Sequence, residues 1–439
     1  MNIRPLAGAL LFSGITAAMA QNLTVTADKE ICKPGEPVRF EFKITDGKHN
    51  PVNDVQIFTL IRVNGLPTRQ KRFAGGSPDA TFSLTQTIPG TMLLVSGWPF
   101  KQANGKTITR WTSAGVVVGP DQIKAGLDEP SDFDQFWKDK KTELASVPMK
   151  AVLAPVDLAT VQNGKHKFYK DKGVEAFEIK IDCAGGKPVT GYLARPVNAS
   201  KKSLPAIVTF QHAGTYSASV PARFGTKAIA MDVNAHGILN GQTPDYYSDL
   251  AKKKLKLYYY SGSDNRETYY YKGVYLRLIR ALEYVKSLPE WNGKDLIVYG
   301  FSQGGAQALA AAGLDPQVSL CIAMCPALCD LGGIVAGRLP GWGTNVKFKD
   351  GKPATPKDEA ILKATSYYDN ANFAKRIKAE TYISAGLRDS VVPTSSVYAA
   401  WNNLPDNIRK HFFLNRLGGH DPVASAEAKM RLNQIIFKP

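Results

Sequence analysis

The sequence predicts a two-part protein, in which an all-β region precedes a larger α/β region built on a mostly parallel sheet. Residues 22–118 contain short runs rich in Val, Ile, Thr and Phe that turn signals separate. Beyond residue 120, short apolar strands alternate with amphipathic helices. The chain has 439 residues, which is too long for one ordinary domain and suits two.

The front region, residues 21–119, is predicted to be a β-sandwich of immunoglobulin type, because six or seven short strands fall within about a hundred residues. It contains no cluster of acids, histidines or cysteines that would carry chemistry. We therefore expect it to serve as a scaffold, a spacer or a surface for assembly. The expected strands are residues 22–27, 37–45, 54–63, 80–86, 92–97 and 108–118.

The second region, residues 120–439, is predicted to hold a buried parallel sheet with helices on both faces, because its strands are apolar throughout. Residues 332–363 interrupt the alternation with Gly, Pro and Lys, and we expect an insertion over one end of the sheet. The expected strands are residues 189–194, 206–210, 228–233, 296–299, 320–324, 380–384 and 411–414, and the expected helices are 273–288, 304–312, 395–403 and 424–437.

The N-terminus has the pattern of a secretory signal. Arg4 gives a positive start, residues 6–15 are largely apolar, and small residues precede an expected cut before Gln21. The apolar stretch is too short to span a membrane, and no longer one follows. Residues 1–20 therefore predict a secreted or periplasmic protein without membrane insertion.

Charge and cysteine content exclude some functions. Lys and Arg number 55 against 38 Asp and Glu, which gives a net charge of +17. This charge is compatible with an acidic polysaccharide, but no nucleic-acid-binding motif accompanies it. The five cysteines are too few for a disulfide scaffold. Cys321, Cys325 and Cys329 lie in or just after an apolar run without a nearby His, so we expect buried thiols and no metal site.

The strongest motif is residues 300–304, Gly-Phe-Ser-Gln-Gly, between a predicted strand and a predicted helix. It fits G-x-S-x-G, in which the serine occupies a strained turn and the glycines let strand and helix approach closely. Ser302 is therefore the candidate nucleophile.

A serine nucleophile needs a base and an acid that orients the base, and this architecture places them in the order Ser, acid, His. Of the two later histidines, His411 starts an apolar strand and is expected to be structural. His420 lies in the loop that follows that strand, where a catalytic histidine belongs. Asp389 follows a strand and is the expected acid. Asp421 is a rival acid, but we reject it because its adjacency to His420 makes a hydrogen bond between its carboxylate and the imidazole awkward.

The oxyanion of the reaction needs fixed N–H donors. The backbone N–H of Gln303 is the expected first donor, and the loop after an early strand should supply the second. The N–H of Ala213 is our choice in that loop. For His212 beside it, shaping the loop and contacting substrate are alternatives.

These residues resemble the acetyl xylan esterase / cephalosporin-C deacetylase family of carbohydrate esterases, over about 290 residues. The resemblance implies an α/β-hydrolase fold, the triad Ser302, Asp389 and His420, oxyanion donors at Gln303 and Ala213, and no cofactor. The matching segments are residues 130–137, 230–233, 268–275, 300–305, 366–369, 386–389 and 419–420.

The chain departs from the family pattern around the site. Residues 234–236 read Asn-Ala-His where the family usually has Arg-Gly-Gln, and residues 212–213 read His-Ala where Gly-Tyr is usual. Asp421 replaces the usual Glu after the histidine. We assign His212 and His236 as candidate substrate-binding residues. Family members often form oligomers, so a homo-oligomer is left open.

The sequence thus predicts an esterase that removes acetyl groups from plant or algal glycans or oligosaccharides. An esterase for another acyl group, such as feruloyl or a short chain, or a peptidase of the same fold, is the alternative that the changed loops suggest. A glycan-binding module with a vestigial site is a third interpretation, favoured by the front β-sandwich and by tyrosines at 258–260 and 269–271 that could be exposed.

Overall fold

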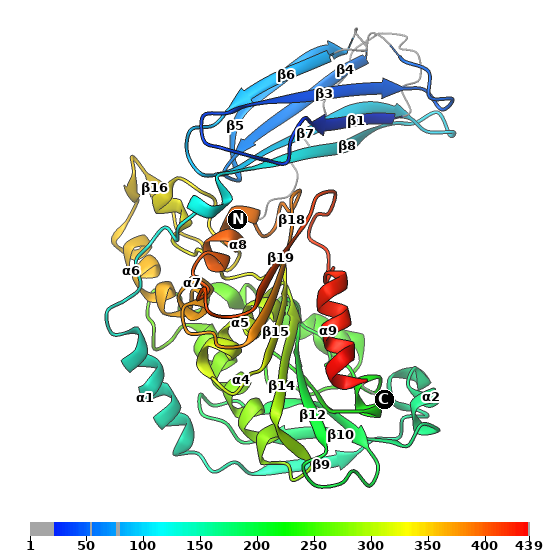
Figure 1. The fold of residues 1–439 in the computed structure, drawn as a ribbon, viewed down its shortest axis with the longest axis vertical. Coiled ribbons are helices and arrows are strands. Elements are labelled where there is room, and N and C mark those ends of the chain that lie inside the picture. The colour runs from blue at the N-terminus through cyan, green and yellow to red at the C-terminus, as the bar shows by residue number, and fades with distance from the viewer. Residues whose placement is uncertain (1–21, 53–54, 76–79, 438–439) are drawn as a thin grey trace.

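The computed structural model describes residues 22–52, 55–75 and 80–437. The expected signal sequence, residues 1–20 with its cut before Gln21, lies outside this described part. A β-rich region comes first in the chain and a larger α/β region follows it (Figure 1). Among the described residues, no helix is both long and apolar enough to cross a membrane.

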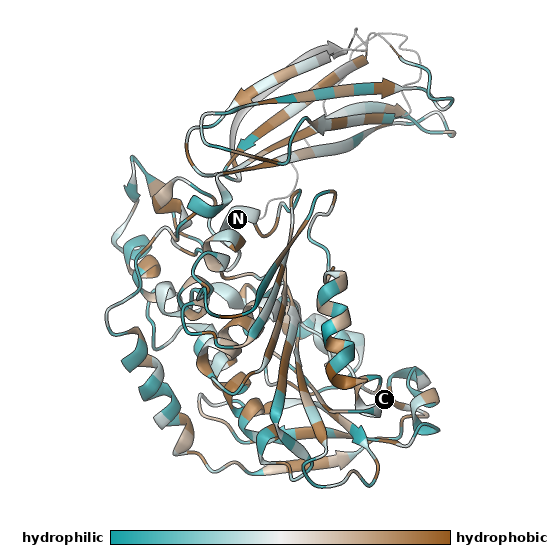
Figure 2. Cartoon of the chain, viewed as in Figure 1, coloured by the Kyte–Doolittle hydropathy of each residue, from teal (hydrophilic) through white to brown (hydrophobic). Residues whose placement is uncertain are grey.

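The β-rich region consists of two sheets, with the strand orders β1-β3-β6 and β2-β8-β7-β4-β5. Alternate residues of β3 are buried, and Val38 and Phe40 meet Leu94 and Val116 of the other sheet in one core. Figure 2 shows the alternation as bands along β3. The immunoglobulin type of this region stays a prediction. The strands are β1 (Asn22–Ala27), β2 (Ile31–Cys32), β3 (Pro37–Thr45), β4 (Val55–Val63), β5 (Leu66–Gly75), β6 (Ala80–Thr85), β7 (Gly90–Lys101) and β8 (Thr107–Val118).

A nine-stranded sheet forms the centre of the α/β region, in the order β19-β18-β15-β14-β12-β13-β11-β10-β9. The strands from β19 to β13 run parallel, and β11, β10 and β9 are antiparallel at one edge. The predicted mostly parallel sheet is therefore confirmed. The strands are β9 (Ala151–Pro155), β10 (Val174–Ile181), β11 (Val189–Pro196), β12 (Leu204–Phe210), β13 (Ile229–Val233), β14 (Trp291–Phe301), β15 (Leu320–Met324), β18 (Glu380–Gly386) and β19 (Lys410–Asn415).

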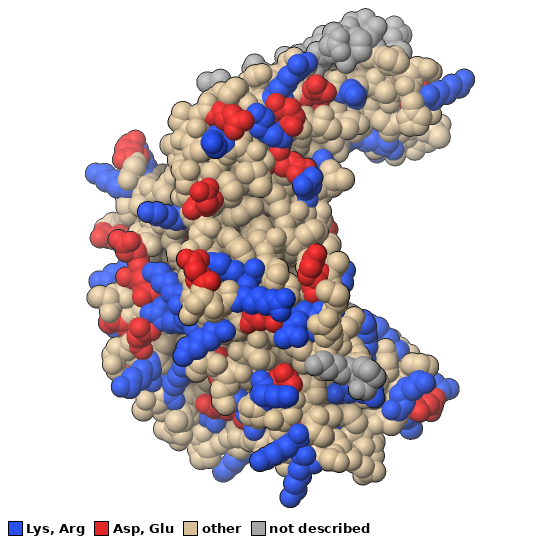
Figure 3. All heavy atoms as spheres, in the orientation of Figure 1, with Lys and Arg blue, Asp and Glu red and all other residues tan. Residues whose placement is uncertain are grey.

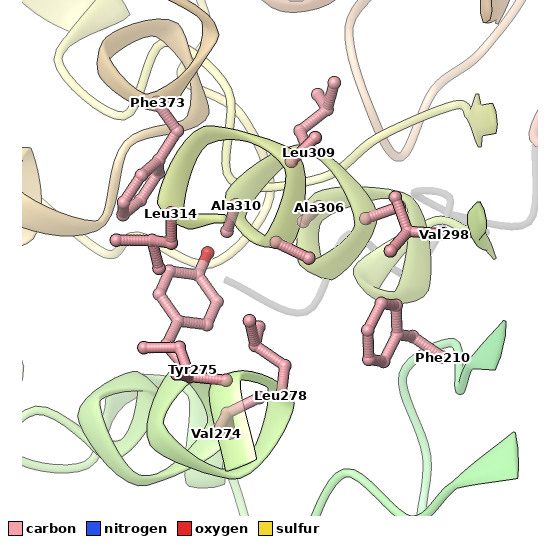
Figure 4. Close-up of a cluster of buried hydrophobic side chains, with 14 of the residues drawn as sticks. Phe210, Val274, Tyr275, Leu278, Val298, Ala306, Leu309, Ala310, Leu314 and Phe373 are labelled. Atoms are coloured by element: carbon pink, nitrogen blue, oxygen red, sulfur yellow. The ribbon is translucent and has the colours of Figure 1, made fainter. Parts of the chain in front are cut away.

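Helices cover both faces of this sheet, because neighbouring residues of a strand point to opposite sides. On β14, Val298 packs towards α4 and α5 (Figure 4), whereas Ile297 lies in a separate core with Leu432 of α9. The helices are α1 (Phe133–Ala145), α2 (Lys167–Lys170), α3 (Pro244–Lys252), α4 (Tyr270–Ser287), α5 (Gln303–Leu314), α6 (Pro356–Thr365), α7 (Asn370–Ala374), α8 (Thr394–Trp401) and α9 (Ala426–Ile436).

The β-rich region packs on loops of the α/β region. Val117 of β8 shares an apolar cluster with Ile123 and with Leu387, which follows β18. The N–H of Leu339, in the predicted insertion, donates to the carbonyl of Asn64 at 2.7 Å. On one side the outline of the molecule is hollowed between the two regions (Figure 3). Residues of the predicted insertion therefore contact the β-rich region.

Candidate active site

Ser302 occupies a strained turn between β14 and α5. Its backbone has φ 57° and ψ −121°, in the region that L residues rarely adopt. A Cβ on Gly300 would lie 2.1 Å from the carbonyl oxygen of Gly304, and a Cβ on Gly304 would lie 2.2 Å from that of Phe210. Only glycine fits at these two positions, so the motif sets the height at which the Ser302 hydroxyl stands above the sheet.

Three side chains that are far apart in the sequence meet at the carboxyl ends of the parallel strands. His420 Nε2 lies 2.9 Å from Ser302 Oγ, and His420 Nδ1 lies 2.7 Å from Asp389 Oδ2. The other oxygen of Asp389 accepts two backbone N–H groups, from Val391 and Val392, each at 2.8 Å. These bonds fix the carboxylate, which in turn fixes the orientation of the imidazole.

His411 and Asp421, the two residues that were rejected as members of the triad, make other contacts. His411 stacks on Tyr382 with ring centroids 4.6 Å apart, away from the serine. Asp421 turns its carboxylate back to the backbone N–H of Gly419 at 2.9 Å. Neither side chain takes part in the hydrogen bonds that join Ser302 to His420.

Cys325 is a close neighbour of the triad that the sequence reading missed. Its sulfur, a carboxylate oxygen of Asp389 and a ring nitrogen of His420 lie within 4.8 Å of one another, a grouping that could hold a metal ion. Burial raises the pKa of the thiol to about 12, and it contacts the carbonyl of Asp421 at 3.5 Å. A neutral thiol beside an imidazole already bonded on both nitrogens suits a proton relay better than a metal centre. The prediction of buried thiols at 321, 325 and 329 is confirmed.

Gln303 has the geometry expected of an oxyanion donor. It is the first residue of α5, so its backbone N–H has no helical carbonyl to bond. Its buried side chain is held by two hydroxyls, which donate to Oε1 from Tyr258 at 2.6 Å and from Tyr271 at 2.8 Å. Ala213, the expected second donor, lies half-buried in the loop after β12. The next residue in that loop, Gly214, has its backbone N–H close to the Tyr258 hydroxyl, where it counteracts the rise in the pKa of that hydroxyl that burial causes.

The assignment of His236 as a substrate-binding residue is wrong. The side chain is 0% exposed, and both ring nitrogens are taken. Nε2 donates to the carbonyl of Gly214 at 2.8 Å, and Nδ1 accepts from the Tyr270 hydroxyl at 2.7 Å. Burial lowers the pKa of His236 to about 4, so the ring is neutral at physiological pH. It anchors the loop that carries Ala213.

His212, in contrast, is exposed at the mouth of the site. Its ring lies 6.1 Å from that of Phe301, which lies 4.8 Å from the ring of His420. Nδ1 of His212 is 3.0 Å from the carbonyl of Ala213, and its ring is 4.9 Å from Tyr216. This position suits both alternatives, since the side chain shapes the loop and faces outwards. Phe301, the variable residue of the serine motif, was missed as part of this aromatic row.

The tyrosine runs are not the exposed binding surface that the third interpretation needed. Tyr258 is 5% exposed and Tyr271 is 0% exposed. Tyr269 is buried as well, and its hydroxyl donates to the carbonyl of Gly343 at 3.0 Å. In the sequence, such runs resemble surface aromatics because tyrosine is common in both settings. In the structure, they pack beneath Gln303 and His236.

Comparison with known proteins places this site in a family. The model of the acetyl xylan esterase (AXE1) family matches residues 122–434. The acetyl esterase Axe7A of Xylanibacter ruminicola is 32% identical over 293 residues, which are 65% of this chain. The chain spans 63% of the length of that curated relative.

Solved structures agree on the fold. An acetyl xylan esterase from Paenibacillus sp. R4 is 27% identical with a TM-score of 0.58, covering 72% of this chain and 98% of its own. Acetyl xylan esterase 1 from Thermoanaerobacterium sp. JW/SL YS485 is 21% identical with a TM-score of 0.57, covering 72% and 97%, and speaks for the fold alone. The predicted α/β-hydrolase fold is thereby confirmed, with a β-rich region added in front. The chain belongs to the acetyl xylan esterase family.

Proposed function

We propose that the protein is a serine esterase that hydrolyses acetyl esters on xylan-type or related glycans and oligosaccharides. The observation that carries the proposal is the hydrogen-bonded row from Ser302 through His420 to Asp389, at 2.9 and 2.7 Å, on strand-end loops. Family membership and the acetyl esterases among the relatives support the acetyl group as the acyl part.

In the first half of the proposed reaction, Ser302 Oγ attacks the ester carbonyl and His420 Nε2 takes its proton. The negative oxygen of the tetrahedral intermediate accepts the N–H groups of Gln303 and Ala213. The bond from the carbonyl carbon to the sugar oxygen then breaks, and His420 returns its proton to that oxygen. The products are a free sugar hydroxyl and an acetyl group on Ser302.

In the second half, water replaces the sugar. His420 takes a proton from the water, whose oxygen attacks the acetyl carbonyl, and the same two N–H groups hold the oxyanion. The bond to Ser302 Oγ breaks, His420 returns the proton to that oxygen, and acetate leaves. Asp389 keeps Nδ1 of His420 as the N–H donor throughout, so that Nε2 is free to accept protons.

The test is Ser302→Ala. With the nucleophile removed, kcat on 4-nitrophenyl acetate should fall by roughly 10⁴-fold or more while the protein stays folded. Ser131→Ala, at an exposed serine ahead of α1, is the matched control and should leave kcat unchanged. Retention of activity in Ser302→Ala would refute the assignment.

The acyl specificity, the export of the protein and its oligomeric state are separate parts of the proposal. A panel of acetyl, butyryl, feruloyl and peptide substrates tests the first, and a preference for an acyl group larger than acetyl would refute it. Export rests on the pattern of residues 1–20 and is tested by N-terminal sequencing of the mature protein, which should begin at Gln21. Light scattering decides between a monomer and a homo-oligomer.

A further inference from the structure

The outer face of the five-stranded sheet in the β-rich region contacts the loop that follows β18 and carries Asp389, here called the acid loop. On β8, Gly115 comes so close that a Cβ there would lie 2.8 Å from the carbonyl oxygen of Leu387, two residues before Asp389. Arg62 of β4 and Leu93 of β7 line a small cavity together with Asp389. Because cross-strand partners share a face, Arg62, Leu93 and Gly115 form one row on this side of the sheet.

Farther along the same face, a second row carries an exposed tryptophan. Phe58, Gly97 and Trp111 are cross-strand partners on β4, β7 and β8. The six-membered ring of Trp111 lies over Gly97, since a Cβ there would be 2.8 Å from Cζ3 and 2.9 Å from Cε3. Phe58 packs edge-on against this ring with centroids 6.3 Å apart. The indole is thus fixed across β7, yet Trp111 is 46% exposed.

The two rows lie at a fixed distance from one another. Trp111 is four residues from Gly115 on a continuous strand, so about 13 Å separate them, and both positions lie on the same face of the sheet. In Figure 1 the free end of the β7–β8 hairpin extends away from the junction, on the side where Figure 3 shows the hollow outline. The ion pair of Glu30 with Arg416, at 2.7 Å, ties the β-rich region to the loop that carries His420.

We propose that Trp111 is the centre of a sugar-binding platform, which stacks on a pyranose ring of the polysaccharide whose acetyl ester enters the active site. This proposal rests on the proposed function. The apolar C–H face of a pyranose packs well on an aromatic ring, because the ring face is electron-rich and the C–H groups are slightly positive. Thr109 and Ser113 flank Trp111 on the same face, half-buried, and offer hydroxyls to the sugar's own hydroxyls.

A sugar fits this surface better than a protein partner does. A protein interface needs a broad apolar core, with roughly 800 Å² buried on each partner. Here one exposed ring is bordered by hydroxyl side chains, which matches a flat ligand with alternating apolar and polar edges. The position also fits, because a glycan chain held at Trp111 lies on the sheet face that continues to the acid loop.

The test compares Trp111→Ala with the wild-type chain on two substrates. On 4-nitrophenyl acetate, which cannot reach the platform and the serine together, kcat/KM should stay within about twofold. On acetylated xylan, acetate release should show a KM about five- to tenfold higher with little change in kcat, the loss expected for one stacking contact. Phe168→Ala, at a ring 63% exposed in α2, is the matched control and should change neither value.

Binding is measured separately, by the retardation of each variant in a native gel that contains deacetylated xylan. The wild type and Phe168→Ala should be retarded, and Trp111→Ala should migrate as it does without xylan. Gly97→Ala keeps the indole but pushes its ring off β7, and should lose retardation as well. Thermal unfolding shows that each variant is folded.

The outcomes separate the two proposals. Equal retardation of the wild type and Trp111→Ala, no retardation of the wild type, full retardation of Gly97→Ala, or equal losses on both substrates would each overturn the platform. A wild-type chain that hydrolyses no acetyl ester would instead refute the proposed function, while retardation by deacetylated xylan would still report on the platform.

Discussion

The variant Tyr258→Phe, which removes one oxygen atom, tests whether a tyrosine holds together the two segments that carry the expected oxyanion donors, Gln303 and Ala213. The Tyr258 hydroxyl donates to Gln303 Oε1 at 2.6 Å and lies close to the backbone N–H of Gly214, next to Ala213. It is therefore a direct bridge between the two segments that carry the expected donors. Tyr271 also donates to Gln303 Oε1, at 2.8 Å, but no hydrogen bond within the described residues joins its hydroxyl to the loop of Gly214.

The size of the effect follows from what each variant leaves behind. Tyr258→Phe removes the oxygen close to the half-buried N–H of Gly214, which costs up to about 1–3 kcal/mol unless the loop moves. Removing an oxyanion donor outright costs about 10²- to 10³-fold in kcat. A shifted donor should cost less, and we expect about 1.5 kcal/mol of transition-state stabilisation, or a roughly tenfold fall in kcat. Tyr271→Phe leaves the bridge intact and should change kcat by about threefold at most.

The assay is steady-state hydrolysis of 4-nitrophenyl acetate, with thermal unfolding measured in parallel. Both variants delete a buried hydroxyl bonded to the same amide oxygen, which costs about 1–2 kcal/mol of stability, and Tyr258→Phe should lose more because it also affects the N–H of Gly214. Their kcat values should differ, because only Tyr258 contacts both of the segments that carry the expected donors. Equal falls in kcat, or a larger fall in Tyr271→Phe, would refute the bridge.

Two further predictions concern buried groups near the site. His236 is protonated near pH 6.5 in the unfolded chain but only near pH 4 in the native chain. As the pH falls from 7 to 4, the free energy of unfolding should therefore drop by about 3 kcal/mol more in the wild type than in His236→Gln. Urea denaturation at each pH measures this difference. Because the pKa of Cys325 is raised to about 12, its thiol should resist iodoacetamide at pH 8, and Cys325→Ala should keep kcat on 4-nitrophenyl acetate within about threefold. Rapid inactivation that Cys325→Ala abolishes would contradict this.

Much of the fold could be predicted because its strands are short, apolar and separated by clear breaks. The strand at 320–324 and the helix from 304 onwards coincide with β15 and α5. Strand β10, Val174–Ile181, was missed because it alternates apolar residues with Glu and Lys, and α3, Pro244–Lys252, because it is only nine residues long and mostly polar. Neither β10 nor α3 contains the uninterrupted apolar run from which the other strands and helices were predicted.

The site divides in the same way. Ser302, His420 and Asp389 could be found because the motif and the chain order restrict where each one lies. The role of His236 could not, since a histidine that anchors a loop and one that meets a substrate look alike in a sequence. Its burial and its bond to Gly214 depend on how the loops after β12 and β13 pack. Trp111 gave no signal either, because its exposure depends on a glycine of the neighbouring strand.

The added β-rich region is coupled to the catalytic geometry through one sheet face. Near the junction that face packs on Leu387, and a bulky residue in place of Gly115 would push the loop that carries Asp389. Farther out, the same strands fix Trp111 over Gly97. Because a paired strand is stiff over such a distance, a sugar held at Trp111 has a defined separation from the acid loop. The β-rich region therefore has two effects that one rigid element combines: it supports the acid, and it sets where along a glycan chain the proposed esterase can act.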